Sequence, residues 1–582
     1  MRERINMNRK NRFMPLWLAL SVVVGVFIGS FFANRFSGNR LSIINSGSNK
    51  LNDLLHIVDD QYVDTVNVND LVEKAMPTIL SELDPHSVYI TQKDVQQAND
   101  DLKGSFFGVG IEFTIRKDTL HVQNVISNGP SERAGLLAGD MIVEIDGQPF
   151  VGKDVTNEEA MHRLKGDKDT KVQIGVLRGK EKKIRQYTVV RGEIPMKSVT
   201  AAYMLDSKTG YIKIKNFGDK TYPELLIVLA RLGQDDFENL VIDLRGNTGG
   251  YLGSAVQMAN EFLTRGQMIV YTEGRRSQRQ EYYCDGRGSY QNLPLVVLID
   301  EGSASASEIF AGAIQDNDRG TIIGRRSFGK GLVQQPISLH DGSMIRLTVA
   351  RYYSPSGRCI QKPYTSGADP SYEEDLINRY QHGEFFSQDS IKHEGPEYHT
   401  SNGRVVYGGG GITPDIFVGE DTLGITSYYK EASMSGLILQ FAYEYVDDNR
   451  QKLSAYKTKR ELLAYLKKLN TVELFANYAE KNGLKRRNLM IQKSHSLLER
   501  YINSRLIYNM LDEQSWTEYL NDDDPAIREA LRVFQAGESF PKPDAPSGQK
   551  SQKVAYDYRA THNKSTLAVL MVHEPVVGIV IV

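Results

Sequence analysis

The sequence predicts an α/β core joined to a β-rich module, a C-terminal helical domain and an apolar N-terminal helix. Three observations support this fold class. Residues 193–420 contain two successive units of buried strand, Gly- or Ser-rich loop and helix, which are typical of a parallel sheet covered by helices. Residues 104–192 form short apolar runs bounded by Gly, Asp and Asn, which indicate strands. Residues 421–540 have helical periodicity and little glycine.

The composition is that of an ordinary globular chain with several domains. The chain has 582 residues, of which 24% are charged and 40% hydrophobic, and its formal net charge is −2. Because Lys and Arg are not in excess, no nucleic-acid partner is expected. Cys284 and Cys359 are the only cysteines, and two cysteines do not establish a disulfide framework.

Residues 1–36 are predicted to be a basic segment followed by a transmembrane anchor. Basic residues precede residues 13–33, an uncharged stretch of about the length that spans a bilayer. A cleaved signal peptide is the alternative, but the stretch is long for a signal core, and Phe31 stands where a small residue is wanted before Ala33. We expect a retained anchor, with the chain after Asn34 outside.

Two further segments flank the predicted domains. Residues 37–103 begin polar and become helical, with apolar residues at three-to-four spacing, which predicts a small helical region. Residues 541–582 are rich in Pro, Lys and Ser and end in an apolar run. Glu574 and Pro575 interrupt that run, which is too short to span a membrane, so we expect a disordered tail.

Lys330 admits three interpretations, of which two are weak. Residues 324–331, "GRRSFGKG", match a phosphate-binding loop until Gly331, which has no hydroxyl for magnesium, and a strand pattern with a proline follows where a helix is needed. A P-loop ATPase is therefore disfavoured. Ser327 and Lys330 have the S-x-x-K spacing of penicillin-recognising acyl transferases, but the flanking glycines oppose the helical turn that this pairing requires, and no K-T-G follows.

The third interpretation makes Lys330 the general base for a serine of "EGSASASEIF", residues 301–310. A lysine can replace histidine if its pKa falls from about 10.4 by roughly three units, which costs about 4 kcal/mol. The glycines and apolar side chains around Lys330 suit such a buried amine. Gln334 lies four residues on, hence on the same side of an extended strand, where its amide would orient the amine.

Ser305 has two possible roles in this pattern. With Glu308 it forms an S-x-x-E capping box at the start of an apolar-striped helix, and capping alone would explain the pattern. A serine held rigidly after a buried strand also suits a nucleophile, because the next amide, that of Ala306, points to where an oxyanion would form. The loop "RGNTGG" ends the neighbouring strand, so Gly249 or Gly250 is the expected second donor.

These residues give the chain a resemblance to the C-terminal processing peptidases, or tail-specific proteases, of the Ser/Lys type. The motifs that match in order and spacing are "LDPHS" (83–87), "DLRGNTGG" (243–250), "GSASASEIFAGAIQD" (302–316), "SFGKGLVQ" (327–334), "YYSPSGR" (352–358) and "GITPD" (411–415). The resemblance implies a crotonase-like core, also seen in Clp peptidase. It assigns Ser305 as nucleophile, Lys330 as base and Gln334 as the support of the lysine, with Ala306 and a glycine of the D-L-R loop as oxyanion hole and no metal or other cofactor.

The β-rich module resembles a PDZ domain through residues 106–113, "FFGVGIEF", and residues 129–147, "GPSERAGLLAGDMIVEIDG". Backbone N–H groups in such a loop can hold a C-terminal carboxylate, and the strand that follows offers an edge for β-augmentation. The loop residues concerned are Phe107, Gly108, Val109 and Gly110. The resemblance implies a module that presents apolar C-termini to the active site.

The combined expectation is a single-pass endopeptidase of the inner (cytoplasmic) membrane whose catalytic part faces the periplasm or the cell exterior. Its expected partners are protein substrates with apolar C-termini, the membrane and, in an oligomer, further copies of the chain. A non-catalytic PDZ scaffold, which binds tails without turnover, is the rival class. The final run, "VVGIVIV" (576–582), resembles such a tail, and it is either an extension without a partner or a segment through which the chain processes or inhibits itself.

Overall fold

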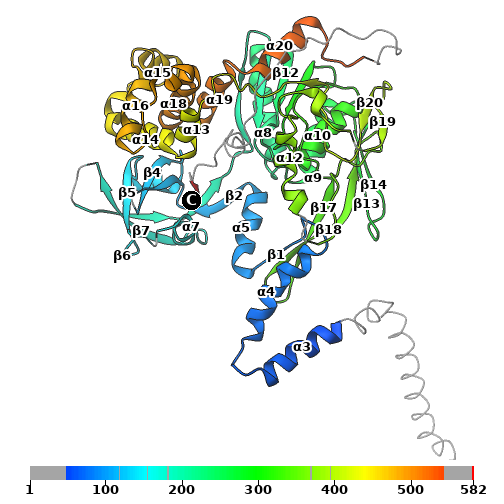
Figure 1. Ribbon diagram of the computed structural model, residues 1–582, viewed down its shortest axis with the longest axis horizontal. Coiled ribbons are helices and arrows are strands. Elements are labelled where there is room, and N and C mark those ends of the chain that lie inside the picture. Colours follow the sequence, from blue (N-terminus) through cyan, green and yellow to red (C-terminus); the bar gives the residue numbers. More distant parts are fainter. Residues whose placement is uncertain are drawn as a thin grey trace, which may run out of the picture. The chain divides into compact units, whose positions relative to one another are not determined.

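The computed structural model describes residues 48–542, apart from 117, 154, 180–182, 368–369 and 394, together with residues 580–581. The chain divides into two compact units, Met1–Leu80 and Ser81–Val582 (Figure 1). The predicted anchor at 13–33 lies outside the described residues. Among the helices that are described, none combines the length and apolar character needed to cross a membrane.

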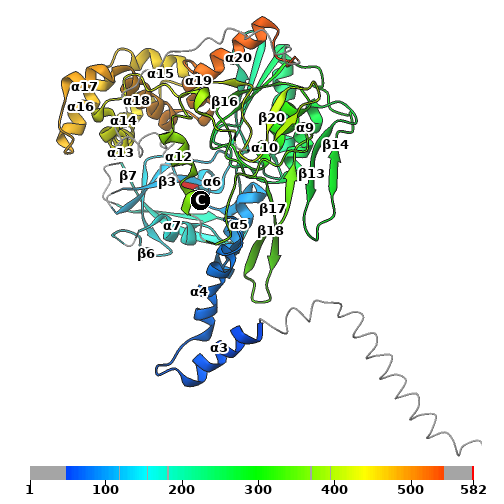
Figure 2. The ribbon, with the colours of Figure 1, turned by 45° about the vertical axis from the view of Figure 1, so that its right-hand side comes forward.

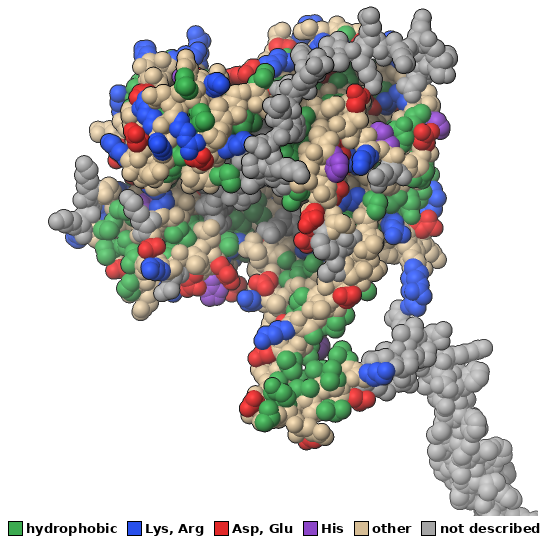
Figure 3. Space-filling view, in the orientation of Figure 1, with side chains coloured by type: hydrophobic (Ala, Val, Ile, Leu, Met, Phe, Trp, Pro, Cys, Tyr) green, Lys and Arg blue, Asp and Glu red, His purple; other side chains and the backbone are tan. Residues whose placement is uncertain are grey.

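The first unit is described by two helices, α3 (Ser48–Gln61) and α4 (Val68–Ser81), the latter ending at the boundary between the units. Both helices lie within the predicted helical region 37–103, of which the structure describes residues 48–103. Hydrophobic side chains gather on this part of the surface (Figure 3), where Leu51, Leu54 and Ile57 of α3 are about half exposed.

A six-stranded sheet forms the centre of the α/β core. Its first strand is antiparallel to the second, and all later neighbours are parallel, which confirms the predicted parallel sheet. Both faces are covered, so the inner strands read as continuous apolar runs. In spatial order the strands are β10 (Val199–Met204), β11 (Thr209–Ile214), β12 (Asn239–Asp243), β15 (Leu295–Ile299), β16 (Thr321–Gly324) and β21 (Ile416–Phe417).

Helices from distant parts of the chain cover the two faces of this sheet. On one face lie α8 (Thr221–Leu232), α9 (Leu252–Phe262) and α10 (Ala306–Asp316), whose apolar side chains share a core with alternate strand residues. On the other face, α20 (Pro525–Ala536) packs its buried stripe against the central strands β12, β15 and β16 (Figure 1). This helix falls within the predicted helical domain, yet it completes the core.

A second sheet carries the long hairpin of β17 (Leu332–Ser338) and β18 (Met344–Tyr353), seen clearly in Figure 2. The opposite edge of β18 pairs with β1 (Val88–Ile90), so residues 88–90 form a strand inside the predicted helical region 37–103. Local periodicity could not show this strand because its partner is distant in sequence. The sheet continues from β18 to β13 (Met268–Glu273) and β14 (Gln280–Tyr283).

The β-rich module is a separate antiparallel sheet with its own apolar core. Five strands form its body, and a two-residue strand, β22 (Val580–Ile581), pairs with the outer edge of β3. The preceding strand, β2 (Ser105–Gly108), pairs with β9 (Gly192–Pro195). The body strands are β3 (Ile111–Arg116), β4 (Thr119–Val125), β5 (Asp140–Ile145), β7 (Lys171–Arg178) and β8 (Arg185–Val190), with β6 (Gln148–Pro149), α6 (Pro130–Ala134) and α7 (Asn157–Leu164) beside them.

Residues 427–521 form the predicted helical domain around one apolar cluster. Its helices are α13 (Ser427–Met434), α14 (Leu437–Leu453), α15 (Lys459–Leu466), α16 (Thr471–Lys481), α17 (Asn488–Lys493), α18 (His495–Met510) and α19 (Glu513–Asn521). Arg116 of β3 forms an ion pair with Glu444 of α14, which links the β-rich module to this domain. The remaining α-helices and strands of the described residues are α5 (Gln92–Lys103), α11 (Pro370–Glu373), α12 (Asp375–Gln381), β19 (Glu397–His399) and β20 (Val405–Tyr407).

Candidate active site

Ser305 stands at the turn between β15 and α10, and its backbone is strained. Its φ of 56° and ψ of −112° lie outside the regions that non-glycine residues normally adopt. The loop after β12 packs directly against this turn, since a Cβ added to Gly249 would lie 2.7 Å from the Cβ of Ser305. Only glycine, which also tolerates the φ of 102° at position 249, allows this approach.

Ser305 differs from the two serines beside it in exposure. Ser303 and Ser307 are fully buried, and their hydroxyls donate to the carbonyl oxygens of Leu244 and Asn247, both at 2.8 Å. Ser305 is only partly buried. The structure therefore supports packing roles for Ser303 and Ser307 and leaves Ser305 as the serine of this group that a substrate can reach.

Lys330 lies in the loop between β16 and β17 and contacts Gln334, as the strand spacing predicts. Its Nζ donates to Oε1 of Gln334 at 3.1 Å, and Nε2 of Gln334 donates to the carbonyl oxygen of His86 at 3.0 Å. Burial lowers the pKa of Lys330, and the positive charge of Arg346 acts in the same direction. Both influences favour the neutral amine that a general base requires.

One carboxylate holds the backbones of Ser305 and Lys330 together. Oε2 of Glu308 accepts the N–H of Ser305 at 2.8 Å and the N–H of Lys330 at 2.9 Å. Its Oε1 accepts the N–H of Gly329 at 2.7 Å and the hydroxyl of Ser327 at 2.5 Å. Burial raises the pKa of Glu308 to about 7, while these four donors favour its ionised form. The predicted capping box is thus present, and its acid also fixes the lysine loop.

A tyrosine makes a second connection between the two segments. The hydroxyl of Tyr352, on β18, lies 3.1 Å from the carbonyl oxygen of Ser305 and also contacts the carbonyl oxygen of Lys330. This side chain is nearly fully buried, and burial raises its pKa well above the ordinary value for tyrosine. A neutral hydroxyl therefore joins the two carbonyl groups at every physiological pH.

The candidate oxyanion donors differ in whether their backbone N–H groups already have an acceptor. The N–H of Gly249 donates to Oδ1 of Asn247 at 2.9 Å, so it is already engaged. Within the described part of the chain, the N–H groups of Ala306 and Gly250 have no such partner. Ala306 is the first residue of α10, where an amide has no carbonyl acceptor within its own helix.

The segment that contains "LDPHS" contributes residues that sequence reasoning did not assign to the site. Asp84 accepts hydrogen bonds from the N–H groups of His86 and Ser87 and from the hydroxyl of Thr348, which fixes the turn before β1. Burial lowers the pKa of His86 to about 4, and the charge of Lys330 adds to this effect. His86 acts on the site through its carbonyl oxygen, the acceptor of Gln334, and the spacing of a motif far away in sequence could not show this.

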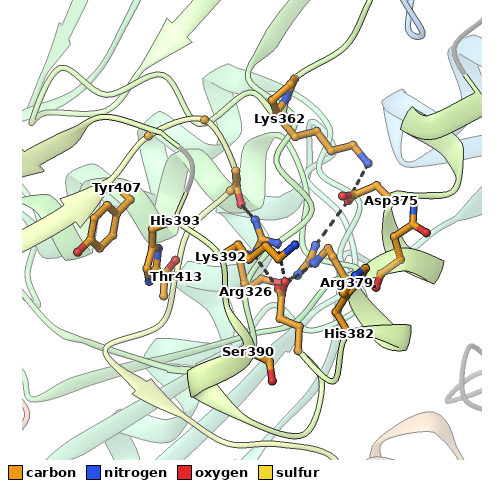
Figure 4. A pocket seen from close by; sticks show the side chains of 17 residues that line it. Arg326, Lys362, Asp375, Arg379, His382, Ser390, Lys392, His393, Tyr407 and Thr413 are labelled. Atoms are coloured by element: carbon orange, nitrogen blue, oxygen red, sulfur yellow. Dashed lines mark hydrogen bonds and ion pairs between the residues drawn. The ribbon is translucent and has the colours of Figure 1, made fainter.

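A cavity of about 200 Å³ lies beside the lysine loop (Figure 4). Arg379 crosses it and donates to the carbonyl oxygens of Arg326 and Ser327, while Arg326 and Arg379 both pair with Glu384. On the far side, Lys362 pairs with Asp375. Lys392 also lines the cavity, so four cationic side chains face two carboxylates there, and Arg379 holds the loop that leads to Lys330.

Asp316 and the two cysteines lie outside the candidate site. Asp316, the last residue of the motif at 302–316, ends α10 and forms a fully buried ion pair with Arg358 at 2.7 Å, which indicates a structural role. Cys284 and Cys359 are both free. Among the described residues, no group of three or more His, Cys, Asp or Glu side chains is arranged to hold a metal ion.

The four residues expected to form a carboxylate loop lie directly before β3. The carbonyl oxygen of Phe107 accepts from the N–H of Gly166, and that of Val109 accepts from the N–H of Ser131. Gly110 has a φ of 78°, and a Cβ at this position would lie 2.9 Å from Ile194. Gly108 ends β2, so the loop turns from one sheet into the other at these residues.

Comparisons with known proteins agree with this architecture. The model of peptidase family S41 matches residues 208–373, a PDZ-domain model matches residues 108–187, and a family of unknown function, DUF8443, matches residues 428–512. The chain is therefore a serine-type peptidase of family S41 with a PDZ domain.

Relatives define the family more narrowly. The chain is 36% identical over 347 residues to the carboxy-terminal-processing protease of Bartonella bacilliformis, covering 58% of this chain and 79% of that protein. Identity is 34% over 325 residues to the carboxy-terminal processing protease CtpB of Bacillus subtilis, covering 55% and 66% of the two chains. A probable CtpA-like serine protease of Staphylococcus aureus (strain MRSA252) is 31% identical over 378 residues, covering 62% and 75%. The chain belongs to the carboxy-terminal-processing proteases, which confirms the resemblance.

Proposed function

We propose that the chain is a membrane-anchored endopeptidase that binds apolar C-terminal tails of exported proteins through its PDZ domain and cleaves them with Ser305 and Lys330. The observation that carries the proposal is the carboxylate of Glu308, which holds the backbones of a partly exposed serine and a desolvated lysine. The lowered pKa of Lys330 and its contact with Gln334 support the role of base.

The proposed reaction begins with proton transfer to a neutral Lys330. As Oγ of Ser305 attacks the scissile carbonyl carbon, Nζ of Lys330 accepts the hydroxyl proton, and the N–H groups of Ala306 and Gly250 donate to the developing oxyanion. Donation to Gln334 occupies one N–H of the amine and leaves its lone pair for the serine.

Collapse of the tetrahedral intermediate then breaks the peptide C–N bond. The leaving amine takes the proton from Lys330, and the substrate acyl group remains bonded to Oγ of Ser305. Water attacks this acyl-enzyme with Lys330 again as base, which releases the new carboxyl end and regenerates the serine. Glu308 accepts the N–H of Ser305 independently of the Ser305 side chain, so the start of α10 stays fixed while Oγ attacks.

The test compares Ser305→Ala, Lys330→Ala and Lys330→Arg with wild type on an unstructured substrate that ends in apolar residues. We expect all three to lose cleavage, with Lys330→Arg as poor as alanine because a guanidinium cannot become neutral. Lys220→Ala is the control, since this lysine is only partly buried and pairs with Glu193, and it should cleave normally. Undiminished turnover in any of the three site variants would refute the assignment. If wild type binds the tail but does not cleave the substrate, the chain is instead a non-catalytic scaffold.

Anchoring and location form a separate part of the proposal, supported by the basic residues before 13–33. We propose that this stretch stays attached and places the protease on the outer side of the cytoplasmic membrane. Full-length chain should float with membranes in a density gradient, and a chain lacking residues 1–36 should not. Intact mass showing removal of the stretch would establish a signal peptide instead.

A further inference from the structure

The outer edge of β3 in the PDZ domain is occupied by the chain's own residues. Val580 pairs with Phe113 and Ile581 with Glu112, in an antiparallel arrangement. Figure 1 marks this end of the chain close to the PDZ domain. As residue numbers rise along β22, those of its partners fall, so β22 runs toward the start of β3, where Gly108 and Gly110 lie.

This edge is the one at which a PDZ domain adds a peptide strand. The other edge of β3 is paired with β4 along its length, so only the outer edge can accept another strand. In β-augmentation the backbone hydrogen bonds of that edge provide much of the affinity. One edge holds one strand at a time, so β22 and a substrate tail exclude each other.

The sequence of the segment also favours this pairing. Residues 576–582, "VVGIVIV", are uncharged and β-branched except for one glycine, a composition that favours strands. Glu574 and Pro575 come directly before them, and a proline cannot donate to a strand ladder. The strand-forming segment therefore begins after Pro575.

We propose that residues 576–582 are an intramolecular ligand of the PDZ domain, which substrate tails must displace before they bind. The inference rests on the proposed function, because it takes the edge of β3 to be the site for tails. Tethering gives the segment an effective concentration on the order of 1 mM, so even a weak self-affinity keeps the edge occupied. Only substrates whose tails bind more tightly, or are presented at high local concentration, then gain access.

The test measures binding of a fluorescent peptide with the sequence VVGIVIV to the full-length chain carrying Ser305→Ala, which prevents cleavage of the probe. A variant lacking residues 576–582 removes the internal ligand, and Val580→Pro with Ile581→Pro removes the backbone N–H groups of both paired residues, including the one that faces β3. The matched control deletes residues 546–552, an equally long part of the tail. We expect both variants to bind the peptide about tenfold more tightly than the parent, and the control to bind like the parent.

The outcomes separate this inference from the proposed function. Equal affinity in all four proteins would overturn the internal ligand and leave tail binding intact. Failure of every protein, including the deletion variant, to bind the peptide would instead contradict the PDZ role. If the difference between parent and deletion variant vanishes on dilution of the protein, the occupant is another copy of the chain, and the intramolecular proposal is wrong.

Disulfide formation between introduced cysteines tests directly whether residues 576–582 lie along β3. Cysteines introduced for Glu112 and Ile581, which lie opposite each other, should form a disulfide within one chain, whereas a pair at Thr188 and Ile581 should not. Intact mass of wild type beside Ser305→Ala then shows whether the internal ligand is also a substrate. Loss of the segment in wild type alone would mean self-processing, which requires that it binds first and so supports the inference.

Discussion

Glu308 is the residue on which the geometry of the site depends most. Its two oxygens accept four hydrogen bonds, and two of the donors are the backbone amides of Ser305 and Lys330. A glutamine at position 308 would replace one carboxylate oxygen by an NH2 group, which cannot accept the hydrogen bonds that this oxygen accepts. Buried donors left without a partner cost about 1–3 kcal/mol.

Glu308→Gln should therefore lower kcat by about 5- to 150-fold while leaving peptide binding by the PDZ domain unchanged. Glu461→Gln is a matched control, since Glu461 occupies the same position in a second, exposed capping box that begins at Thr458. Steady-state cleavage and peptide binding would be measured on both. An equal effect of the two substitutions on kcat would show that only helix capping is involved.

As the proposed general base, Lys330 should make activity depend on pH, in a direction that its surroundings determine. The base must be neutral, so kcat/KM should rise with pH as Lys330 loses its proton. Arg346 lowers the pKa of Lys330, and removal of this charge by Arg346→Gln should raise that pKa. We expect the rising limb of the profile to move to higher pH and activity at neutral pH to fall.

Arg351→Gln is the control for this prediction, because Arg351 is also on β18 but is not among the charges that act on Lys330. Its pH profile of kcat/KM should match that of wild type. A profile of Arg346→Gln that coincides with wild type would mean that another group controls the rise.

Ser305, Lys330 and Gln334 are predictable as site residues because their spacing and neighbours indicate a particular chemistry. The structure brings Gln334 to Lys330, and Glu308 and Tyr352 link the segments of Ser305 and Lys330. The contributions of Glu308 to the lysine loop and of His86 to Gln334 arise only from tertiary contacts. No local pattern in the sequence contains that information.

At the scale of elements, the loop between β12 and α9 determines how closely the serine turn is approached. Gly246 and Gly249 both have positive φ, so alanine strains the backbone at either position. They differ in space: nothing lies within 4 Å of a Cβ at Gly246, whereas a Cβ at Gly249 meets Ser305 and the N–H of Ala306. This pair separates backbone strain from obstruction of the site.

Gly249→Ala should reduce kcat at least about 100-fold, because a Cβ at 2.9 Å from the nitrogen of Ala306 displaces a proposed oxyanion donor. Gly246→Ala should lower the free energy of unfolding by about as much as Gly249→Ala does, but it should keep most of its activity. Thermal unfolding and cleavage rates would be compared for both. Comparable activity in the two variants would contradict the proposed oxyanion site.

Elements were predictable where local pattern determines them, and less so where packing does. The parallel strands β12 and β15 follow from their continuous apolar runs, and the helices of 427–521 from their periodicity. The apolar stripe of α20 indicated a helix but not its partner, which is the central sheet. Strand β1 forms because β18 offers it an edge, and a three-residue segment carries too little pattern to show this.

At the scale of the whole molecule, the ion pair between Arg116 and Glu444 connects the PDZ domain to the helical domain. The guanidinium of Arg116 also lies 4.5 Å from the centre of the Tyr443 ring, and His121 contacts the same ring edge-on. Arg116 ends β3, the strand whose outer edge binds β22. The helical domain thus contacts the strand that is proposed to receive tails.

This contact predicts that the helical domain helps to position the PDZ domain for cleavage. Arg116→Glu places two acidic residues together and should lower kcat/KM for a substrate with an apolar tail by about 2- to 10-fold, given the usual strength of a partly exposed ion pair and a cation–π contact. Cleavage of a short peptide without such a tail should be unaffected. Arg116→Glu combined with Glu444→Arg restores opposite charges and should recover at least half of the lost efficiency, whereas the exposed Lys171→Glu on β7 should have no effect. If the charge swap fails to recover efficiency while both proteins remain folded, the helical domain does not act through this pair, and its influence on tail cleavage must be sought in other contacts with the PDZ domain.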